Sequence, residues 1–419
     1  MADVQRVAHS LRPDDPFRTR HSCMSSYAEA ARLLAEGGHD IYDLRLYQPR
    51  QLGPLNVDPY HYPPPFLLVP QAIHGVTADF WHFRALWFTL QALVLAGAIV
   101  LTCVWLGGFA GTVALTGGML LLTLPGVLFG IQQGNFQVTA APIAIVAIIL
   151  ISGRRVSSGA LLLAYAAAAK IFPGILVVYL AGARRWRALA WIGVCGALLL
   201  ALTLLTQGTR PTIDFVTHAL PQMSSGAAFP HTEWPRTATM NWTAYGVTVR
   251  LRNLGVAALD QRTGLRIASV YGLLVIGLAA LAGWKGRISN DVVAGRIALL
   301  QVALALVALA SFRSPFAGAP YGSMSTLWLM AFVAAGAPNM RRAAIWLTAM
   351  FVLGMAIWSL PSPAYGPTTF TLVISGLLFL TTVGINLWAV WRGAISSSPR
   401  FFQELTAAPP VLSHAPRRT

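Results

Sequence analysis

The stretch from Ala85 to Gly153 contains no Asp, Glu, Lys or Arg, and this feature restricts the possible folds more than any other. A membrane crossing needs about 20 mainly apolar residues, so the stretch is long enough for several helices packed side by side in a membrane. The composition agrees, because 56% of the residues are hydrophobic and only 11% are charged. We therefore expect an all-α, polytopic integral membrane protein, and not a soluble domain or a disordered chain.

The apolar segments predict about nine full crossings of a bilayer. They span residues 83–106, 110–130, 133–152, 188–206, 267–284, 296–312, 320–337, 343–360 and 368–391.

The segment 157–183 has a different pattern, because Lys170 and Pro173 interrupt it and arginines flank both of its ends. A single crossing would place one of the two arginine groups outside the cell. Two half-length helices that form a re-entrant hairpin would keep both groups on the cytoplasmic side, as the positive-inside rule requires. We favour the hairpin, and cysteine labelling from the two sides of the membrane distinguishes it from a single crossing.

Three parts of the chain follow from this topology. Residues 1–66 form an outer-face segment, 67–391 the transmembrane domain with a long outer loop at 207–266, and 392–419 a disordered cytoplasmic tail. The beginning of the chain has no signal-peptide pattern that would carry residues 1–82 outside. Either a preceding membrane helix is missing from this sequence or the topology is inverted, and we expect the missing helix.

The opening segment is the polar part of the chain, and seven of the fourteen acidic residues lie between Pro13 and Phe66. Residues 27–38 have the pattern of a short amphipathic helix that ends at Gly37 and Gly38. A tyrosine-rich loop and a run of prolines follow, before the chain enters the membrane. We expect this segment to cover a site that the membrane helices present.

The net charge of +16 does not indicate nucleic-acid binding, because the arginines lie in short loops and in the tail and form no stripe with exposed aromatic residues. The three cysteines make a disulfide framework improbable, since Cys103 and Cys195 lie inside apolar spans. No spacing typical of metal ligands is present. We therefore expect no metal and no cofactor.

Two cations are candidates for binding a phosphate group. Lys170 is a lysine at membrane depth, where a charge costs about 2.5–3.5 kcal/mol on insertion scales and therefore indicates function. Arg313 lies in a turn rich in Pro and Gly, with no neighbouring carboxylate. The alternatives are a lysine that reaches the membrane surface or caps a helix, and an arginine that anchors the interface.

A second group of polar residues could contact a sugar or an acceptor. Asn135 and Gln137 lie at the start of a helix, where Asn135 could equally be a helix cap. The others lie in outer segments, where a histidine can also be ordinary polar surface. The full set is Asn135, Gln137, Tyr62, Asn241, His218 and His231.

Asp14, Asp15 and Asp58 are candidates for a general base. Each of them, taken alone, could be a turn or cap residue. A carboxylate with an ordinary pKa near 3.9 is ionised at neutral pH and can accept a proton.

Several short motifs, taken together and in this order, resemble glycosyltransferase family 87 of the GT-C superfamily of polytopic glycosyltransferases. The resemblance runs from about Tyr27 to Trp391. Members of that family include polyprenyl-phosphate-mannose-dependent mannosyltransferases and related arabinofuranosyltransferases of bacteria. The motifs are the tyrosine-containing helix with Glu36-Gly37-Gly38, Ile41-Tyr42-Asp43, Tyr62-Pro63-Pro64-Pro65-Phe66, Gly134-Asn135-Phe136-Gln137, Ala169-Lys170-Ile171-Phe172-Pro173 with Arg184-Arg185-Trp186-Arg187, and Asn241-Trp242-Thr243.

The resemblance implies an inverting glycosyltransferase of the bacterial cytoplasmic membrane, with its active site on the outer face and a catalytic carboxylate in the first outer loop. The implied partners are a polyprenyl-phosphate sugar donor, a lipid or glycan acceptor and membrane lipids, without nucleic acid. Family members often carry an aspartate four residues before the helix tyrosine, where this chain has Cys23. We therefore expect Asp15 to be the base, with Asp14 and Asp58 as the next candidates.

A transporter or flippase of lipid-linked sugars is the alternative function. A transporter would carry ionisable residues deep in the membrane and paired interrupted helices in two related halves. The chain shows one interrupted pair, and its polar residues concentrate in the outer loops. The pattern favours the enzyme.

Overall fold

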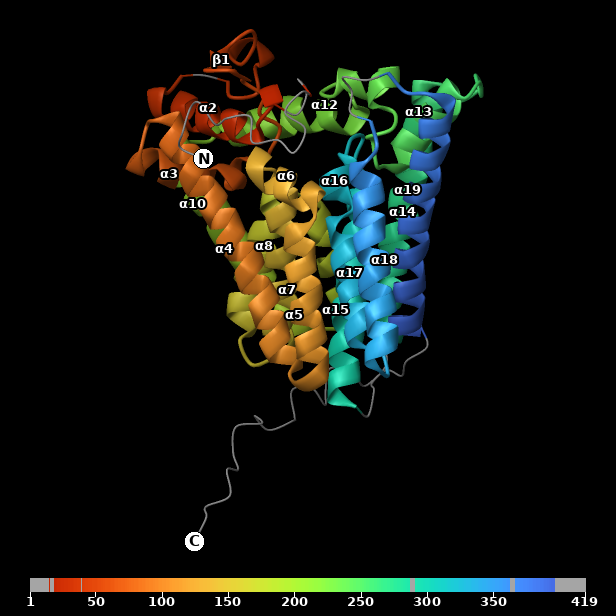
Figure 1. Ribbon diagram of the computed structural model, residues 1–419. Coiled ribbons are helices and arrows are strands. Elements are labelled where there is room, and N and C mark those ends of the chain that lie inside the picture. The colour runs from red at the N-terminus through yellow and green to blue at the C-terminus, as the bar shows by residue number, and fades with distance from the viewer. Residues whose placement is uncertain (1–14, 16–18, 39, 287–290, 362–365, 396–419) are drawn as a thin grey trace.

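Long apolar helices run side by side in the computed structural model, and a layer of short polar elements covers one end of them (Figure 1). The structure describes residues 15, 19–38, 40–286, 291–361 and 366–395. Asp14 and most of the expected tail, residues 396–419, lie outside the described residues.

Within the described residues, six helices are long and apolar enough to cross a membrane. Each corresponds to a crossing expected from the sequence. They are α4 (Phe80–Leu106), α10 (Trp186–Gln207), α14 (Gln261–Lys285), α15 (Val292–Ser311), α18 (Met340–Trp358) and α19 (Thr369–Val390), the last continued by η8 (Trp391–Ile395).

The crossing expected at 110–130 is bent in the structure. It consists of α5 (Gly108–Thr123) and α6 (Pro125–Gln133), whose axes differ by 65°. The break falls at Leu124, which is extended with φ −67° and ψ 126°. A residue that precedes proline is disfavoured in the helical region, so Pro125 ends one helix while it begins the next.

Several of the remaining apolar segments form helices that are shorter than expected for a full crossing. The crossings expected at 133–152 and 320–337 correspond to helices of 16 and 12 residues. The count of nine crossings and the re-entrant hairpin therefore stay predictions. The short elements are α7 (Gln137–Ser152), α8 (Val156–Ala169), η4 (Phe172–Gly174), α9 (Ile175–Gly182), α16 (Ala319–Gly322) and α17 (Met324–Ala335).

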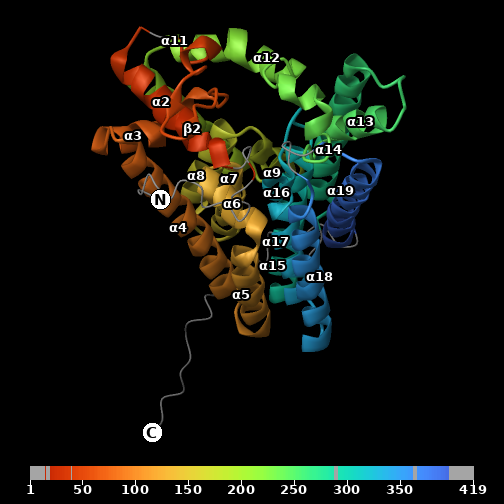
Figure 2. The ribbon, with the colours of Figure 1, turned by 45° about the horizontal axis from the view of Figure 1, so that its top comes forward.

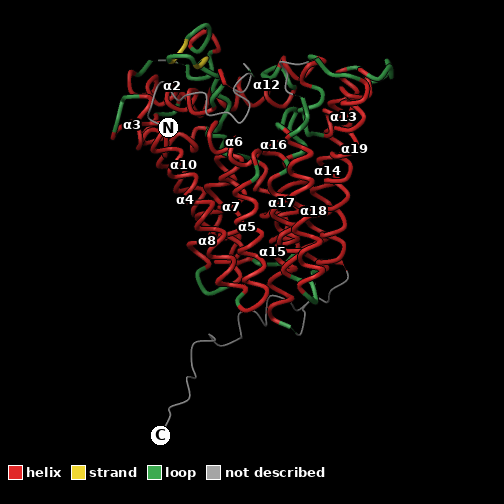
Figure 3. The backbone as a smooth tube through the Cα atoms, in the orientation of Figure 1, coloured by secondary structure: helices red, strands yellow, loops and turns green. Residues whose placement is uncertain are grey.

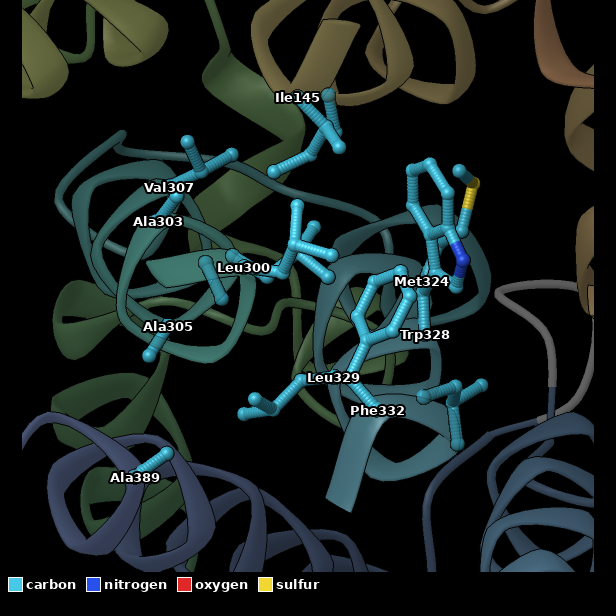
Figure 4. Packing of buried hydrophobic residues seen from close by; sticks show 14 of the residues in the cluster. Ile145, Leu300, Ala303, Ala305, Val307, Met324, Trp328, Leu329, Phe332 and Ala389 are labelled. Carbon is cyan, nitrogen blue, oxygen red and sulfur yellow. The ribbon is translucent and has the colours of Figure 1, made fainter. Parts of the chain in front are cut away.

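The core of the bundle lies around α15, because 72% of the most apolar 18-residue stretch of this helix is buried inside the protein. Figure 4 shows Leu300 of this helix beside Trp328 and Leu329 of α17. Lipid tails are as apolar as leucine, so close packing has to supply the attraction between membrane helices. Gly117 of α5 illustrates this, because a Cβ at its position would lie 2.4 Å from the Cβ of Ala331.

The polar layer, which we define as the described residues of 19–79 and 208–260, combines two segments that are far apart in the chain (Figures 1 and 3). Figure 2 shows α11 and α12 running over this end of the bundle between α2 and α13. Its first segment contains α2 (Cys23–Glu36), η2 (Leu44–Leu46), β1 (Gln51–Leu52), β2 (Leu55–Asn56), η3 (Pro64–Leu67) and α3 (Leu68–Val76). Its second segment contains α11 (Arg210–Asp214), η5 (Phe215–Ala219), α12 (Leu220–Ser225), η6 (Pro230–Glu233), η7 (Pro235–Thr237) and α13 (Ala244–Asn253).

Helix α2 confirms the predicted amphipathic helix and begins four residues earlier than expected, at Cys23 rather than Tyr27. It ends at Gly37, whose φ of +73° is a conformation that glycine adopts without strain. Its buried Glu29 forms ion pairs with Arg32 and Arg50, which compensate the cost of burying a carboxylate. The antiparallel pair β1 and β2 aligns Leu52 with Leu55.

Candidate active site

Helix α2 is held against the turn between α6 and α7 by reciprocal hydrogen bonds. The Ser22 hydroxyl donates to the carbonyl of Gln133 over 3.3 Å, and the Gln133 side chain donates to the carbonyl of His21 over 3.1 Å. The turn itself requires Gly134, because its φ is +73° and a Cβ there would lie 2.1 Å from Met24. These contacts place the start of α2 directly over residues 133–137.

Lys170 lies where α8 ends, and its ammonium group contacts this same turn. Its Nζ donates to Tyr62 Oη and to Asn135 Oδ1, each over 3.3 Å. Tyr27 Oη donates to Tyr62 Oη over 2.8 Å, and Asn135 Oδ1 also accepts from the Gln137 amide over 2.9 Å. We call Lys170, Tyr62, Tyr27 and Asn135 the Lys170 cluster.

Aromatic rings from the polar layer and from α4 pack against the cluster. The Tyr62 ring stacks on Phe66 with ring centres 4.5 Å apart, and Tyr27 meets Trp87 edge-on at 5.2 Å. Burial raises the pKa values of Tyr27 and Tyr62 well above their ordinary value. Both phenols are therefore neutral at physiological pH and can donate or accept hydrogen bonds.

Asp58 forms an ion pair at the start of α2. Its Oδ1 lies 2.8 Å from His21 Nδ1, and the two side chains are 25% and 38% exposed. Burial lowers the pKa of His21, but the hydrogen bond and the charge of Asp58 outweigh this effect, so the pKa of His21 is raised. The Asp58 amide donates to Ser25 Oγ over 3.0 Å, which fixes the loop to α2.

Cys23 is the first residue of α2 and follows Ser22, which bonds to Gln133. Burial and the charge of Asp58 raise the pKa of the Cys23 thiol to about 12, while the charge of Lys170 opposes this shift. The thiol is therefore neutral at physiological pH. Hydrogen bonds link Asp58 and Lys170 through the turn 133–135, because Gln133 bonds to the carbonyl of His21, the partner of Asp58, and Asn135 accepts from Lys170.

Two further histidines lie beside this site. His61 packs edge-on against Phe229 at 5.0 Å, and His231 packs against Phe316 at 4.8 Å. Burial lowers the pKa of each to about 4, and a neighbouring histidine, His231 for His61 and His21 for His231, adds to the lowering because two imidazoles so placed disfavour a charge on either. Both imidazoles are neutral at physiological pH and can hydrogen-bond to an uncharged ligand.

The comparisons with known proteins agree with a membrane enzyme of this kind. The model of glycosyltransferase family 87 matches residues 60–311, which is more than half of the chain. The chain belongs to glycosyltransferase family 87. It is therefore a multi-pass membrane glycosyltransferase.

The crystal structure of ArnT from Cupriavidus metallidurans in the apo state is similar to this family 87 protein at 15% sequence identity. The similarity covers 90% of this chain and 74% of that chain, with a TM-score of 0.33. No curated protein matches the sequence.

The structure of the glycosyltransferase brings together part of the predicted site. Lys170, Asn135 and Tyr62 are in direct contact, and Gln137 follows through its backbone amide. Asp58 is linked to the same turn through His21, whose carbonyl accepts from the Gln133 side chain. His231 packs against Phe229, which also packs against His61, the residue before Tyr62.

Asn241 lies in a different part of the protein, beside the turn 312–319. We call this turn, together with Asn241, Thr243 and Arg250, the Asn241 clamp. Its amide donates to the carbonyl of Pro315 over 2.9 Å and accepts from the Thr243 hydroxyl over 2.9 Å. Arg250 Nη1 donates to the carbonyl of Asn241 over 2.8 Å. Asn241 is 0% exposed, so a sugar contact by this residue would require the clamp to open.

Among the described residues, Arg313 and His218 also make no contact with the Lys170 cluster. Arg313 is exposed, and its side chain passes over Gly272 of α14, where an added Cβ would lie 2.8 Å from Arg313 Cγ. Phe316 connects the turn of Arg313 to His231. His218 lies beside Asp40 and Asp214.

Asp15 is buried, with 1% of its surface exposed, and its carbonyl accepts hydrogen bonds from the amide and the hydroxyl of Thr19. Sequence reasoning did not select His21, His61, Gln133 or Tyr27. The only available signal was their position within the family motifs or next to them, since their partners come from distant segments.

A surface cavity of about 800 Å³ lies elsewhere, along the first turns of α14. Its lining does not include the Lys170 cluster, so the hydrogen bonds and charges, and not the cavity, locate the candidate active site. The lining residues are Ser225, Ala227, Gln261, Arg262, Leu265, Arg266, Ser269 and Val270.

Proposed function

We propose that this glycosyltransferase transfers mannose or a related sugar from a polyprenyl-phosphate donor to a lipid or glycan acceptor, with inversion at the anomeric carbon. The observation that carries the proposal is that the turn 133–135 bonds to His21, the partner of Asp58, through Gln133 and to Lys170 through Asn135. A general base and a cation for a leaving phosphate are the two groups that this reaction needs. Both are present in one partly buried site.

The reaction follows from this arrangement. An oxygen of the Asp58 carboxylate removes the proton of the acceptor hydroxyl, and the acceptor oxygen attacks the anomeric carbon. The bond from that carbon to the phosphate oxygen breaks, and polyprenyl phosphate leaves with the electron pair. Lys170 offsets the charge that develops on the leaving phosphate, because a fixed cation in a low-dielectric site acts strongly on nearby charge.

Asp58 replaces Asp15 as our first choice for the base. Its carboxylate is 25% exposed and can meet an acceptor, whereas Asp15 is 1% exposed. Asp58 also contacts His21 and Ser25, which lie on either side of Cys23, the position where family members often have an aspartate. The loop that contains Asp58 would then supply the carboxylate, in place of the aspartate that the start of α2 lacks.

We also propose that the polar layer faces the outside of a bacterial cytoplasmic membrane. Gln207, at the end of α10, donates to the carbonyl of Pro64 in the polar layer over 3.1 Å. The start of the 22-residue α10, next to Arg184 and Arg185, lies about 33 Å away along the helix axis. The re-entrant hairpin would keep Arg154 and Arg155 at that same cytoplasmic end.

The topology is tested by single cysteines in a variant without the natural cysteines. We expect a membrane-impermeant maleimide to label residue 255 in intact cells, and residues 186 and 340 only after permeabilisation. Residue 154 should also be labelled only after permeabilisation, and labelling of 154 and 186 from opposite sides would exclude the hairpin.

The function is tested with the purified full chain in lipid nanodiscs. The donors are polyprenyl-phosphate mannose and polyprenyl-phosphate arabinofuranose, the acceptors are extracted envelope lipids and glycans, and NMR determines the anomeric configuration of the product. Asp58→Asn keeps the shape of the side chain and removes its basicity. We expect transfer to fall about 100-fold or more, the usual scale for loss of a general base, while donor binding remains.

Asp15→Asn and Asp79→Asn are the matched controls. Asp79 is an exposed helix cap of α4 and should tolerate the change with parental transfer rates. If Asp15→Asn abolishes transfer while Asp58→Asn is active, Asp15 is the base. If neither donor is consumed with any acceptor, although both bind, the proposed reaction is wrong.

A further inference from the structure

Three potential metal ligands come together within the polar layer, away from the Lys170 cluster. They are Asp40, in the turn after α2, Asp214, the last residue of α11, and His218, in η5. One ligand atom from each lies within 4.8 Å of the other two. The group therefore joins two segments that are far apart in the sequence.

The hydrogen bonds of these residues leave ligand atoms available. Asp214 Oδ2 is inaccessible to solvent and makes no hydrogen bond among the described residues, although buried carboxylate oxygens are normally paired. Arg210 Nε is 3.6 Å from this oxygen, which is too far for a hydrogen bond. Asp40 Oδ1 accepts from the Tyr42 amide over 2.9 Å, which leaves its other oxygen for a ligand.

The same arrangement brings like charges together. Two carboxylates at this separation repel one another, and Arg210, whose side chain is 62% exposed, is a weakly held counter-charge. His218 adds an imidazole with two ring nitrogens, one of which lies 3.4 Å from Thr217 Oγ1. A divalent cation would offset both carboxylates and use the imidazole at once.

We propose that Asp40, Asp214 and His218 form a binding site for a divalent cation of the Zn²⁺ class. Imidazole together with carboxylate is a donor set that suits Zn²⁺, whereas Ca²⁺ and Mg²⁺ prefer oxygen ligands alone. Tetrahedral ligands at about 2.0–2.2 Å from Zn²⁺ lie about 3.4 Å from each other, so small side-chain rotations close the site. Water would complete the coordination.

The ion would brace the polar layer above the active site. Tyr42, two residues after Asp40, packs against Phe215 with ring centres 5.7 Å apart. Its hydroxyl donates to the carbonyl of Tyr62 over 2.9 Å, and the Tyr62 hydroxyl belongs to the Lys170 cluster. The ion therefore fixes the loop that carries Tyr62 to η5.

The test uses the full chain without a polyhistidine tag, treated with EDTA, desalted and incubated with ZnCl₂, MnCl₂ or CaCl₂ separately. Bound metal is measured by mass spectrometry after gel filtration, and thermal unfolding is followed with and without metal. We expect about one Zn²⁺ per chain, a higher melting temperature with Zn²⁺, and little retained Ca²⁺. This test does not depend on transfer activity, so it stands apart from the proposed function.

His218→Ala and Asp214→Asn should each weaken Zn²⁺ binding at least tenfold and remove the rise in melting temperature. His82→Ala is the matched control, because His82 forms an exposed pair with Asp79 at 2.7 Å but has no third ligand among the described residues. Since the His218 side chain is exposed, its replacement should leave the fold intact. Retention of Zn²⁺ by His218→Ala at the parental level, or no retention by the parental chain, would overturn the proposal.

Discussion

The Lys170 cluster and the Asn241 clamp are two polar regions of one protein, and they differ in the partners of their polar groups. In the Lys170 cluster, side chains bond to side chains, as Lys170 does to Tyr62 and Asn135. In the Asn241 clamp, side chains bond mainly to backbone carbonyls, as Asn241 does to Pro315. A carbonyl within a turn has a fixed place, whereas a hydroxyl or ammonium group can exchange its partner for a ligand.

Burial alone would not distinguish the two regions. Burial lowers the pKa of Arg250 in the clamp to about 10, yet this residue donates to the carbonyls of Ala238 and Asn241. The clamp also contains backbone hydrogen bonds from Trp242 to Ala317 and from Ala244 to Phe312. We infer that Arg250, whose partners are backbone carbonyls, stabilises the fold. Lys170, whose partners are side chains, can exchange them for a ligand.

Lys170→Met gives the strongest test of this comparison. Removing a charged hydrogen bond to phosphate from a low-dielectric site costs about 1.5–3 kcal/mol, so we expect transfer to fall roughly 10- to 100-fold. The melting temperature should stay the same or rise, because an uncharged chain of similar length is less costly to bury. Transfer kinetics and thermal unfolding, measured on one preparation, check both parts. Normal transfer by a well-folded variant would remove Lys170 from the mechanism.

Asn241→Ala should show the opposite behaviour. The change removes the two short hydrogen bonds of the Asn241 side chain and leaves the Pro315 carbonyl only a 3.5 Å contact with the Thr243 hydroxyl, which costs about 1–2 kcal/mol of folding stability. We expect a lower melting temperature. At temperatures below it, the transfer kinetics should equal those of the parental protein. A large loss of transfer without a loss of stability would show that the clamp takes part in catalysis.

Arg313→Ala tests the boundary between the two regions, since Arg313 belongs to the turn that the clamp holds but has an exposed side chain. We expect the KM for the lipid donor to rise about three- to tenfold, less than for Lys170, because water screens an exposed charge. Arg262→Ala, on the surface of α14, serves as the control. Equal effects of both changes would point to general attraction of anionic lipid.

His21→Asn should have the smallest effect, and it should depend on pH. The pKa of His21 is raised in the folded protein, so its pairing with Asp58 stabilises the fold fully below the unfolded pKa near 6.5 and is lost as pH rises through the raised pKa. The pair is partly exposed, so its contribution is about 1 kcal/mol or less. Thermal unfolding of both proteins from pH 5.5 to 9 should show a difference that shrinks with rising pH. A constant difference would exclude this explanation.

The sequence was sufficient for the six long membrane helices, and it singled out Lys170, whose role stays a prediction. Helices such as α4 and α15 follow from composition alone, and a lone lysine between apolar segments stands out by its cost. The family resemblance named the correct enzyme class. Helix α2 followed from its amphipathic pattern and its terminal glycines.

The positions of the carboxylates and the imidazoles could not be predicted in the same way. His21 meets Asp58 through folding of the segment between them, and no local pattern records that contact. Asn241 has the same residue type as Asn135, but only the surrounding chain shows that one lies in a clamp and the other beside Lys170. The Asp40, Asp214 and His218 group was missed for the same reason, since sequence spacing finds only ligands that lie on neighbouring residues.

The 65° bend between α5 and α6 has a consequence for how much the chain can vary in length. The nine residues of α6 extend about 13 Å, so the bend moves the end of α6 about 12 Å sideways from the axis of α5. That lateral reach carries Gln133 and Asn135 under α2. Because each added helical residue rotates the remainder of the helix by about 100°, a single insertion or deletion in α6 would turn both side chains away from their partners. The number of residues from Pro125 to Asn135 is therefore restricted. Substitutions in α6 can preserve the position of Asn135, whereas insertions and deletions there cannot.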